Sequence, residues 1–267
     1  MCELLTMSCR HPDRLTTSLS TLASHAQGEC RNRDGWGMAF YQGSDVALYR
    51  DTVSADESLQ LQWLESHGPD TTLAAGYIRH ATQGAVCLAN TGPFIRELHG
   101  RMHVFTHNGS MPNLAHSPLN RETRFQPVGE TDSELAFCLL LERMARLEQN
   151  RDDAHSLQRR LESVAAMASE LRSWGPATFC YADGEVLFAH ADRRFQPVTQ
   201  KIAAPALFQL VCPDQNSNAL QRECGKDEQR MVLLASTPLS EEGWQPMAEG
   251  EVIAVCRGEI VARLNIT

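Results

Sequence analysis

The spacing of apolar residues along the chain predicts several helices. Leu15, Leu19, Leu22 and Ala23 follow the i, i+4, i+7, i+8 spacing that places side chains on one helix face, so residues 14–26 are predicted to be helical. The same kind of pattern predicts helices over residues 55–67, 131–147 and 153–174. The helix at 131 has the clearest start, because T-D-S-E at 131–134 fits a capping box with Thr131 as N-cap and Glu134 three residues later.

Short apolar runs predict strands on both sides of the last two helices. Gly43-Ser44 separates two such runs and Asp183-Gly184 separates two more, so each pair is predicted to form a hairpin. The predicted strands cover residues 4–5, 36–42, 46–50, 72–80, 102–107, 177–182, 185–190, 206–212, 230–236, 251–256 and 259–264. Strands, then a helix pair, then strands again predict an α+β fold with helices packed on sheets.

Composition narrows the class of protein. The chain has 267 residues, of which 42% are hydrophobic and 21% charged, as in ordinary globular proteins. Its 24 Lys and Arg residues against 33 Asp and Glu give a net charge of −9 and form no basic cluster, which argues against a nucleic-acid surface. The longest apolar runs, 136–141 and 231–235, are far shorter than the about 20 residues of a membrane-spanning helix. Without repeats or a linker, residues 1–267 are predicted to form a single domain.

The nine cysteines do not look like a disulfide framework. No two are spaced C-x-x-C, most lie alone in apolar stretches, and the first twenty residues lack the apolar core of a secretion signal. Disulfide frameworks are typical of small secreted domains. We therefore predict free thiols and a cytoplasmic protein.

Cys2 is the first candidate for chemistry. Removal of Met1 would leave a residue that carries both a thiol and a free α-amine. An α-amine has a pKa of about 7.7–8.0, so it can accept the thiol proton and activate the sulfur as a nucleophile. The alternative is an ordinary buried N-terminal cysteine.

Three further segments place polar residues at the ends of predicted elements. Arg79 and Thr82 follow an apolar strand, and an arginine there can hold a carboxylate with two hydrogen bonds. Asn108 and Gly109 end another strand and offer a side-chain and a backbone N–H, the two donors that an oxyanion hole needs. Asp132 lies in the first turn of a helix, where an acid also suits the helix dipole. Taken singly, each segment has an equally ordinary reading as a turn, a surface ion pair or a cap.

In this order, however, the motifs resemble a known family. M-C-E-L-L, D-G-W-G-M-A-F-Y, I-R-H-A-T-Q-G, N-T-G-P-F, T-H-N-G and G-E-T-D-S-E, between residues 1 and 134, are similar to those of the class II glutamine amidotransferases, which are N-terminal nucleophile hydrolases. The set looks most like the short, stand-alone, YafJ-like branch of that family. This resemblance implies a four-layer αββα sandwich.

The resemblance also implies roles for single residues. Cys2 would be the nucleophile that forms a γ-glutamyl thioester with glutamine, and Asn108 and Gly109 would form the oxyanion hole. Arg79, helped by Thr82, would hold the α-carboxylate of the substrate, and Asp132 its α-ammonium group. Neither a cofactor nor a metal is needed for this chemistry. With no room predicted for a synthase domain, ammonia would pass to water or to a separate acceptor protein.

There are three alternatives to this function. The first is a metal site, because His99, His103 and His107 recur every four residues near Cys87. On the predicted strand, however, four residues span about 13 Å, which is too far for one zinc ion. The same fold could instead cleave another γ-glutamyl amide or peptide. It could also serve as a catalytically silent binding subunit. His80 stands where synthase-linked members of the family often have tryptophan, which leaves coupling to a second site open.

Overall fold

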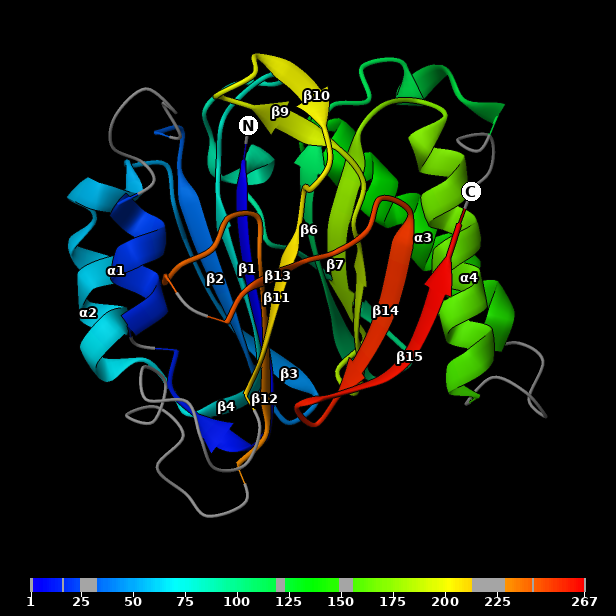
Figure 1. Ribbon diagram of the computed structural model, residues 1–267. Helices are drawn as coiled ribbons and strands as arrows, with labels where there is room; N and C mark the ends of the chain where they lie inside the picture. Colours follow the sequence, from blue (N-terminus) through cyan, green and yellow to red (C-terminus); the bar gives the residue numbers. More distant parts are fainter. Residues whose placement is uncertain are drawn as a thin grey trace.

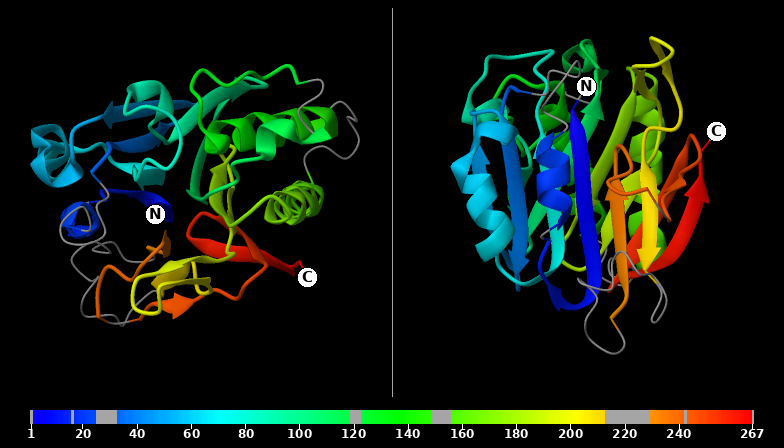
Figure 2. Two further views of the ribbon diagram at one scale, coloured as in Figure 1. Left: turned by 90° about the horizontal axis from the view of Figure 1, so that it is seen from above. Right: turned by 60° about the vertical axis from the view of Figure 1, so that its left-hand side comes forward.

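The computed structural model describes residues 2–15, 17–24, 33–118, 123–148, 156–212, 229–241 and 243–266. Two antiparallel sheets lie face to face in these residues, and a pair of helices covers the outer side of each (Figures 1 and 2). This is the predicted α+β fold with αββα layers.

The first sheet has seven strands in the order β13-β11-β12-β1-β4-β2-β3. Their bounds are β1 Glu3–Asp13, β2 Trp36–Gln42, β3 Asp45–Asp51, β4 Thr71–Ile78, β11 Phe208–Cys212, β12 Met231–Ala235 and β13 Gln245–Pro246. Strand β1 is central, because it pairs with β12 on one side and β4 on the other.

The second sheet has six strands in the order β15-β14-β8-β7-β6-β5. Their bounds are β5 Phe94–Leu98, β6 Arg101–Gly109, β7 Ala177–Ala182, β8 Leu187–His190, β14 Glu251–Cys256 and β15 Glu259–Asn265. A separate two-stranded hairpin, β9 Arg194–Gln196 with β10 Lys201–Ala203, lies at the end of the molecule where β1 begins (Figure 1).

Alternation along the strands divides the core into three layers. One face of the first sheet packs on α1 (Thr17–Ser24) and α2 (Leu59–His67). One face of the second sheet packs on α3 (Asp132–Glu148) and α4 (Leu157–Arg172). The remaining faces meet in a central layer that draws residues from both sheets, among them Ala75, Leu234, Val104 and Ile253.

Most predicted elements are confirmed, with shifted ends. The described part of the predicted helix 14–26 is helical over 17–24, and that of 153–174 over 157–172; residues 16, 25, 26 and 153–155 lie outside the described residues. The predicted helix 55–67 is a short 3-10 turn, Ala55–Glu57, followed by α2. Strand β1 is much longer than its apolar Leu4-Leu5 start, since it continues through polar residues to Asp13. Both predicted hairpins, β2–β3 and β7–β8, are present.

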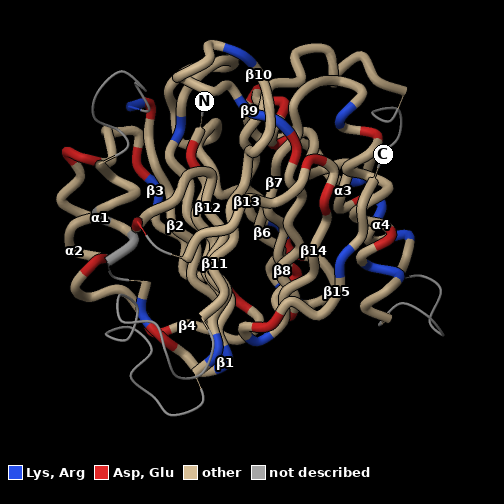
Figure 3. The backbone as a smooth tube through the Cα atoms, in the orientation of Figure 1, with Lys and Arg blue, Asp and Glu red and all other residues tan. Residues whose placement is uncertain are grey.

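Charged residues of both signs are interspersed over the backbone (Figure 3). In the described part of the chain no helix is long and apolar enough to cross a membrane. The described cysteines, Cys2, Cys9, Cys87, Cys138, Cys180, Cys212 and Cys256, carry free thiols, as predicted, while Cys30 and Cys224 lie outside the described residues.

Candidate active site at the start of β1

Cys2 immediately precedes the central strand of the first sheet. In the register of β1 with β4, Glu3 lies opposite Ile78 and Leu4 opposite Tyr77. Because side chains alternate along a strand, Cys2 and Leu4 share a face, and with Tyr77 they form a small buried cluster. Cys2 is therefore held by the sheet, with only 8% of its surface exposed.

The Cys2 sulfur has two hydrogen-bonding neighbours on β4 and the loop that follows. The Tyr77 hydroxyl oxygen lies 2.9 Å from Sγ, and the His80 backbone N–H donates to Sγ at 3.3 Å. Burial raises the pKa of the Cys2 thiol, while the His80 N–H and the Tyr77 hydroxyl act in the opposite direction. Burial also raises the pKa of Tyr77 well above its usual value, so its hydroxyl keeps its proton. The thiol consequently needs a base, and a thiolate formed there has two donors beside it.

Tyr77 is a site residue that the motif analysis missed. The signal was present, because Tyr77 and Arg79 are two residues apart and alternation places such residues on one face of a strand. A tyrosine in an apolar strand is equally typical of a packed core, so its residue type alone does not indicate a role beside the nucleophile.

Arg79 is buried and organises the loop that follows β4. Its guanidinium donates to three backbone carbonyls, those of Ala85 at 3.0 Å, Gln83 at 3.1 Å and Gly84 at 3.3 Å. Thr82 lies in the same loop with its side chain exposed. The loop is thus wrapped around the arginine, and binding of a carboxylate by Arg79 and Thr82 stays a prediction.

The D-G-W-G motif supports this loop from the other side. The Arg79 N–H donates to the Gly35 carbonyl at 2.8 Å, and the Asp34 N–H donates to the Arg79 carbonyl at 3.2 Å. The Asp34 carboxylate accepts the Ala81 N–H at 2.7 Å. Gly35 has a φ of 116°, which a residue with a side chain rarely adopts. Two motifs more than forty residues apart are therefore joined beside the cysteine.

Asn108 and Gly109 end β6, opposite Thr178 and Ala177 of β7. A side chain on Gly109 would collide with the backbone, because its Cβ would lie 1.8 Å from the Pro176 carbonyl oxygen. Glycine is required there by the close approach of the two strands.

The side chain of Asn108 connects β6 to the nucleophile strand. Its Nδ2 lies 3.3 Å from the Ser236 hydroxyl, which also accepts the Leu4 N–H at 3.0 Å. Ser236 follows β12 directly and is fully buried, as is Asn108. One hydroxyl thus bridges the predicted oxyanion-hole residue and the strand that carries Cys2.

Asp132 is buried at the start of α3. Its carboxylate accepts the N–H of Met111 at 2.5 Å and that of Ser133 at 2.8 Å. The predicted cap is half confirmed: the Thr131 hydroxyl accepts the Glu134 N–H at 3.2 Å. The Glu134 carboxylate, however, accepts the N–H of Gly129 at 2.7 Å. Glu134 therefore anchors the loop before the helix.

A pocket of about 200 Å³ opens beside Asp132. Its lining includes Asp132, Gln83, Met111, Pro127 and Leu135. It combines an apolar wall with polar groups from both the Arg79 loop and the start of α3.

Two side chains tie those two segments together. The Gln83 amide donates to the Glu130 carbonyl at 3.0 Å. Asn90, which is buried, donates to the Ala85 carbonyl at 3.0 Å and accepts the Glu130 N–H at 2.7 Å. These hydrogen bonds join the loop that follows Arg79 to the residues before Asp132, and the two segments together are called the shared rim of the pocket.

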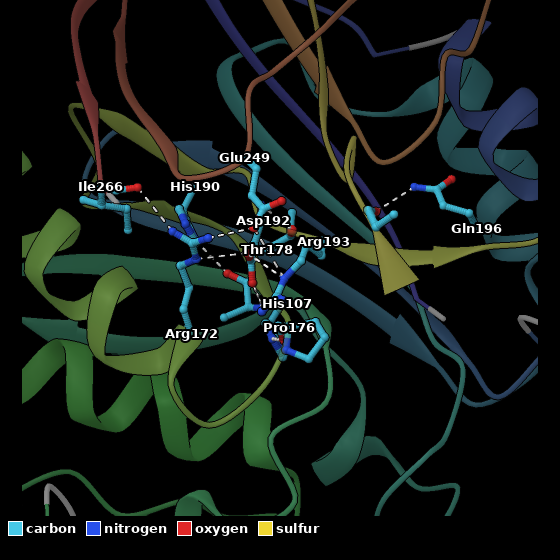
Figure 4. A network of polar contacts seen from close by, with 12 residues as sticks. His107, Arg172, Pro176, Thr178, His190, Asp192, Arg193, Gln196, Glu249 and Ile266 are labelled. Atoms are coloured by element: carbon cyan, nitrogen blue, oxygen red, sulfur yellow. Dashed lines mark hydrogen bonds and ion pairs between the residues drawn. The ribbon is translucent and has the colours of Figure 1, made fainter. Parts of the chain in front are cut away.

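A buried polar network surrounds Thr178 and Asp192 (Figure 4). The Asp192 carboxylate accepts from Arg172 Nε at 3.0 Å and from the Ala177 N–H at 3.0 Å, and the Asp192 N–H donates to the Thr178 hydroxyl at 3.0 Å. Because Ala177 and Thr178 pair with the two predicted oxyanion-hole residues, this network fixes the strand that carries their partners.

The histidines considered for a metal site have other surroundings. His103 and His107 lie on strand β6, as predicted for that segment. His103 Nδ1 lies 2.6 Å from the Tyr181 hydroxyl, and His107 Nδ1 lies 2.8 Å from the Ser133 hydroxyl. Over the described residues, no group of three His, Cys, Asp or Glu side chains could hold a metal ion.

Cys2 lies at the start of the central strand of an αββα sandwich, Asn108 and Gly109 end β6, and Asp132 is buried at the start of α3. The profile of the family described as "Glutamine amidotransferases class-II" matches residues 1–266. The chain belongs to this family.

Individual relatives agree with this assignment. The chain is 31% identical over 266 residues to the Escherichia coli protein named "Putative glutamine amidotransferase YafJ", covering 98% of this chain and 100% of that one. It resembles the crystal structure of a predicted glutamine amidotransferase from Pseudomonas aeruginosa PA01, with a TM-score of 0.68 and 26% identity over 98% of this chain and 100% of the other.

A glutamine phosphoribosylpyrophosphate amidotransferase from B. subtilis shares the fold, with a TM-score of 0.64 and 14% identity over 99% of this chain. The match covers 49% of the B. subtilis chain.

Proposed function

We propose that this chain hydrolyses the side-chain amide of glutamine to glutamate and ammonia, with Cys2 as its nucleophile. The observation that carries the proposal is the setting of the Cys2 sulfur: it lies at the start of the central strand, 2.9 Å from the Tyr77 hydroxyl and 3.3 Å from the His80 nitrogen. Residues 1–267 would act as one amidotransferase domain in the cytoplasm.

The mechanism begins once Met1 has been removed. The α-amine of Cys2 accepts the thiol proton, and Sγ forms a bond to the γ-carbonyl carbon of glutamine. The Asn108 side chain and the Gly109 N–H stabilise the oxyanion that results; loss of one such donor typically lowers kcat by about 100- to 1000-fold.

The tetrahedral intermediate then breaks down. The C–N bond breaks, the α-ammonium group returns its proton to the leaving nitrogen, and ammonia departs from a γ-glutamyl thioester. Water, deprotonated by the same amine, attacks the thioester carbon. The C–S bond breaks, the sulfur regains a proton, and glutamate is released. The α-amine of Cys2 thus accepts and returns the proton in both half-reactions.

The substrate would be oriented by the opposite end of the site. Arg79, with Thr82, would bind the α-carboxylate, and Asp132 the α-ammonium group. Support comes from the shared rim, in which Gln83 and Asn90 join the Arg79 loop to the start of α3. Holding both α-groups fixes the amide in front of the nucleophile. The ammonia would go to water or to a separate acceptor protein.

The proposal is tested with a preparation whose N-terminus is verified by mass spectrometry as Cys2. Glutamate release is measured from glutamine and from γ-glutamyl dipeptides. Cys2→Ala should abolish turnover, whereas Cys9→Ala, which removes a buried thiol on the same strand bonded to the Thr71 carbonyl, should retain it. A sample that retains Met1 should be inactive, because the Cys2 nitrogen then lies in a peptide bond and cannot act as the base.

The three possible results of this assay distinguish the glutamine substrate, another γ-glutamyl substrate and a silent subunit. Turnover of glutamine supports the proposal. Turnover of a γ-glutamyl dipeptide alone would keep the mechanism and change the substrate. No turnover of any γ-glutamyl amide, with Cys2 at the N-terminus, would mean that the chain is a silent binding subunit.

A further inference from the structure

The Asn108 carboxamide has an unbalanced set of hydrogen bonds. Its Nδ2 lies 3.3 Å from Ser236 Oγ, while its Oδ1 is buried and has no partner among the described residues. A buried carbonyl oxygen without a donor destabilises the fold, because its hydrogen bond to water is lost and not replaced.

The Ser236 hydroxyl has the complementary imbalance. It accepts the Leu4 N–H at 3.0 Å and, as placed, a second N–H from Asn108. A hydroxyl also donates one proton, and within the described residues that proton has no acceptor. The Ser236 oxygen therefore accepts from both Leu4 and Asn108, while Oδ1 of the same Asn108 amide accepts no hydrogen bond from the described residues.

Rotation of the Asn108 carboxamide by 180° about its terminal torsion resolves both imbalances. The oxygen and nitrogen exchange places without a change of shape. Ser236 then accepts from Leu4 and donates to Asn108 Oδ1. Nδ2 then takes the buried position of Oδ1, which receives no hydrogen bond from the described residues, and it would donate from there to an oxyanion formed on the substrate.

Resting on the proposed function, we propose that Ser236 is a positioning residue that sets the direction of the Asn108 carboxamide. Its hydroxyl binds the oxygen of that amide and so turns Nδ2 toward the developing oxyanion. Ser236 does not contact the substrate and acts through Asn108 alone.

The surroundings of Ser236 suit this role. Its N–H donates to the Leu4 carbonyl at 3.0 Å, and its carbonyl accepts from Arg194 at 2.6 Å. Arg194 is held in turn by a buried ion pair with Glu3 at 2.8 Å. The backbone of Ser236 is thus fixed to the first residues of the nucleophile strand, which keeps its hydroxyl at a constant place relative to Cys2.

The test measures kcat and KM for glutamate release in four chains that begin at Cys2: wild type, Ser236→Ala, Asn108→Ala and the double variant. Ser236→Ala should lower kcat about 10-fold with little change in KM, because an oxyanion contact exists only in the transition state. Asn108→Ala should lower kcat about 100- to 1000-fold. In the Asn108→Ala background, removal of the Ser236 hydroxyl should have no further effect.

Ser8→Ala is the matched control. Ser8 is also buried, and its hydroxyl accepts a backbone N–H, that of Gly258 at 3.2 Å, at a point further along β1. It should retain the wild-type kcat. Ser236→Thr keeps a hydroxyl and should retain most of the wild-type kcat. It therefore tests the role of the hydroxyl even if Ser236→Ala folds poorly.

The outcomes separate this inference from the proposed function. If the wild-type chain does not turn over, the proposed function fails and the positioning role fails with it. If the wild-type chain is active and Ser236→Ala matches it, only the role of Ser236 is overturned. The same conclusion follows if the effects of Ser236→Ala and Asn108→Ala multiply, since Ser236 would then act through the strand rather than through Asn108.

Discussion

At the scale of single residues, the Cys2 sulfur is balanced between opposing influences. Burial raises the pKa of its thiol, and the His80 N–H and Tyr77 hydroxyl favour the thiolate. The His80 donor belongs to the backbone, so truncation of the His80 side chain does not remove it. Tyr77 supplies the other donor through a single hydroxyl group, so its contribution can be measured.

Replacement of Tyr77 by phenylalanine removes that hydroxyl and leaves the ring in place. The thiolate then loses a donor at 2.9 Å, and hydrogen bonds to charged groups contribute about 1.5–3 kcal/mol. We expect the pKa of Cys2 to rise and kcat/KM for glutamine to fall by roughly 10-fold or more. The pH dependence of Cys2 alkylation by iodoacetamide, followed by mass spectrometry, reports the pKa directly.

Tyr41→Phe is the control for loss of a buried tyrosine hydroxyl. The Tyr41 hydroxyl donates to the carbonyls of Met102 and Ala182, on the neighbouring sheet. This variant should lose stability and keep the alkylation profile of the wild type. An unchanged profile in Tyr77→Phe would show that the tyrosine packs against the sulfur without tuning it.

At the scale of elements, the site depends on how two loops are joined. Asn90 is buried between the loop after β4 and the loop before α3, with one hydrogen bond to each. Its amide fits closely between two glycines: a Cβ on Gly84 would lie 2.6 Å from Asn90 Nδ2, and a Cβ on Gly129 would lie 2.3 Å from Asn90 Oδ1. The loops can therefore approach each other only because both contribute glycine.

Asn90→Ala should separate the two loops without touching the nucleophile. We expect KM for glutamine to rise by about 10-fold, equivalent to roughly 1.4 kcal/mol, while kcat falls less, because the loops carry the predicted α-carboxylate and α-ammonium contacts. Hydrogen exchange over residues 79–85 and 129–131 should become faster. Steady-state kinetics and exchange mass spectrometry provide the two measurements.

An exposed asparagine serves for comparison. Asn113 precedes a short 3-10 turn and makes no side-chain cap hydrogen bond, so Asn113→Ala should leave KM and exchange unchanged. A fall in kcat at constant KM in Asn90→Ala would place the effect of Asn90 on the chemical step and contradict its assignment to substrate binding.

The elements that the sequence predicted are those whose signal is local. The β2–β3 hairpin needs only Gly43-Ser44 between two apolar runs, and the start of α3 needs only Thr131 and its neighbours. Strand β5 (Phe94–Leu98) was missed because it carries the charged residues Arg96 and Glu97 and is stabilised by pairing with β6. The short β9–β10 hairpin was missed because three-residue strands leave almost no pattern.

The site shows the same limit. Cys2, Arg79, Asn108, Gly109 and Asp132 stand out because their residue types match a chemical task. The residues that position them are ordinary in sequence and act over long separations: Ser236 meets Leu4 across 232 positions, and Tyr77 meets Cys2 across 75. Such contacts are set by sheet order, which no local pattern encodes.

At the scale of the whole molecule, the second sheet carries three buried histidines. His103 and His107 lie on β6 and His190 on β8. Burial lowers the pKa of His103 and of His190 to about 4, and it lowers that of His107 as well. All three are therefore neutral in the folded chain at neutral pH and would each take up a proton on unfolding in mild acid.

This difference predicts acid sensitivity of the fold. An unfolded histidine has a pKa near 6.5, so between about pH 6.5 and 4 the unfolded chain binds more protons than the folded one. Stability should therefore be fully present above about pH 6.5 and fall as the pH drops toward 4, with a slope of up to about 1.4 kcal/mol per pH unit for each histidine. Urea unfolding curves recorded between pH 4.5 and 7.5 give this slope.

Two variants test which histidines cause the slope. His103→Asn and His190→Asn, in which the amide nitrogen can replace Nδ1 as a donor, should each reduce the slope of stability against pH. His67→Asn, at an exposed position, serves as the control. If either buried variant keeps the wild-type slope, that histidine is protonated in the folded chain, and its neighbourhood must be able to hold a charge.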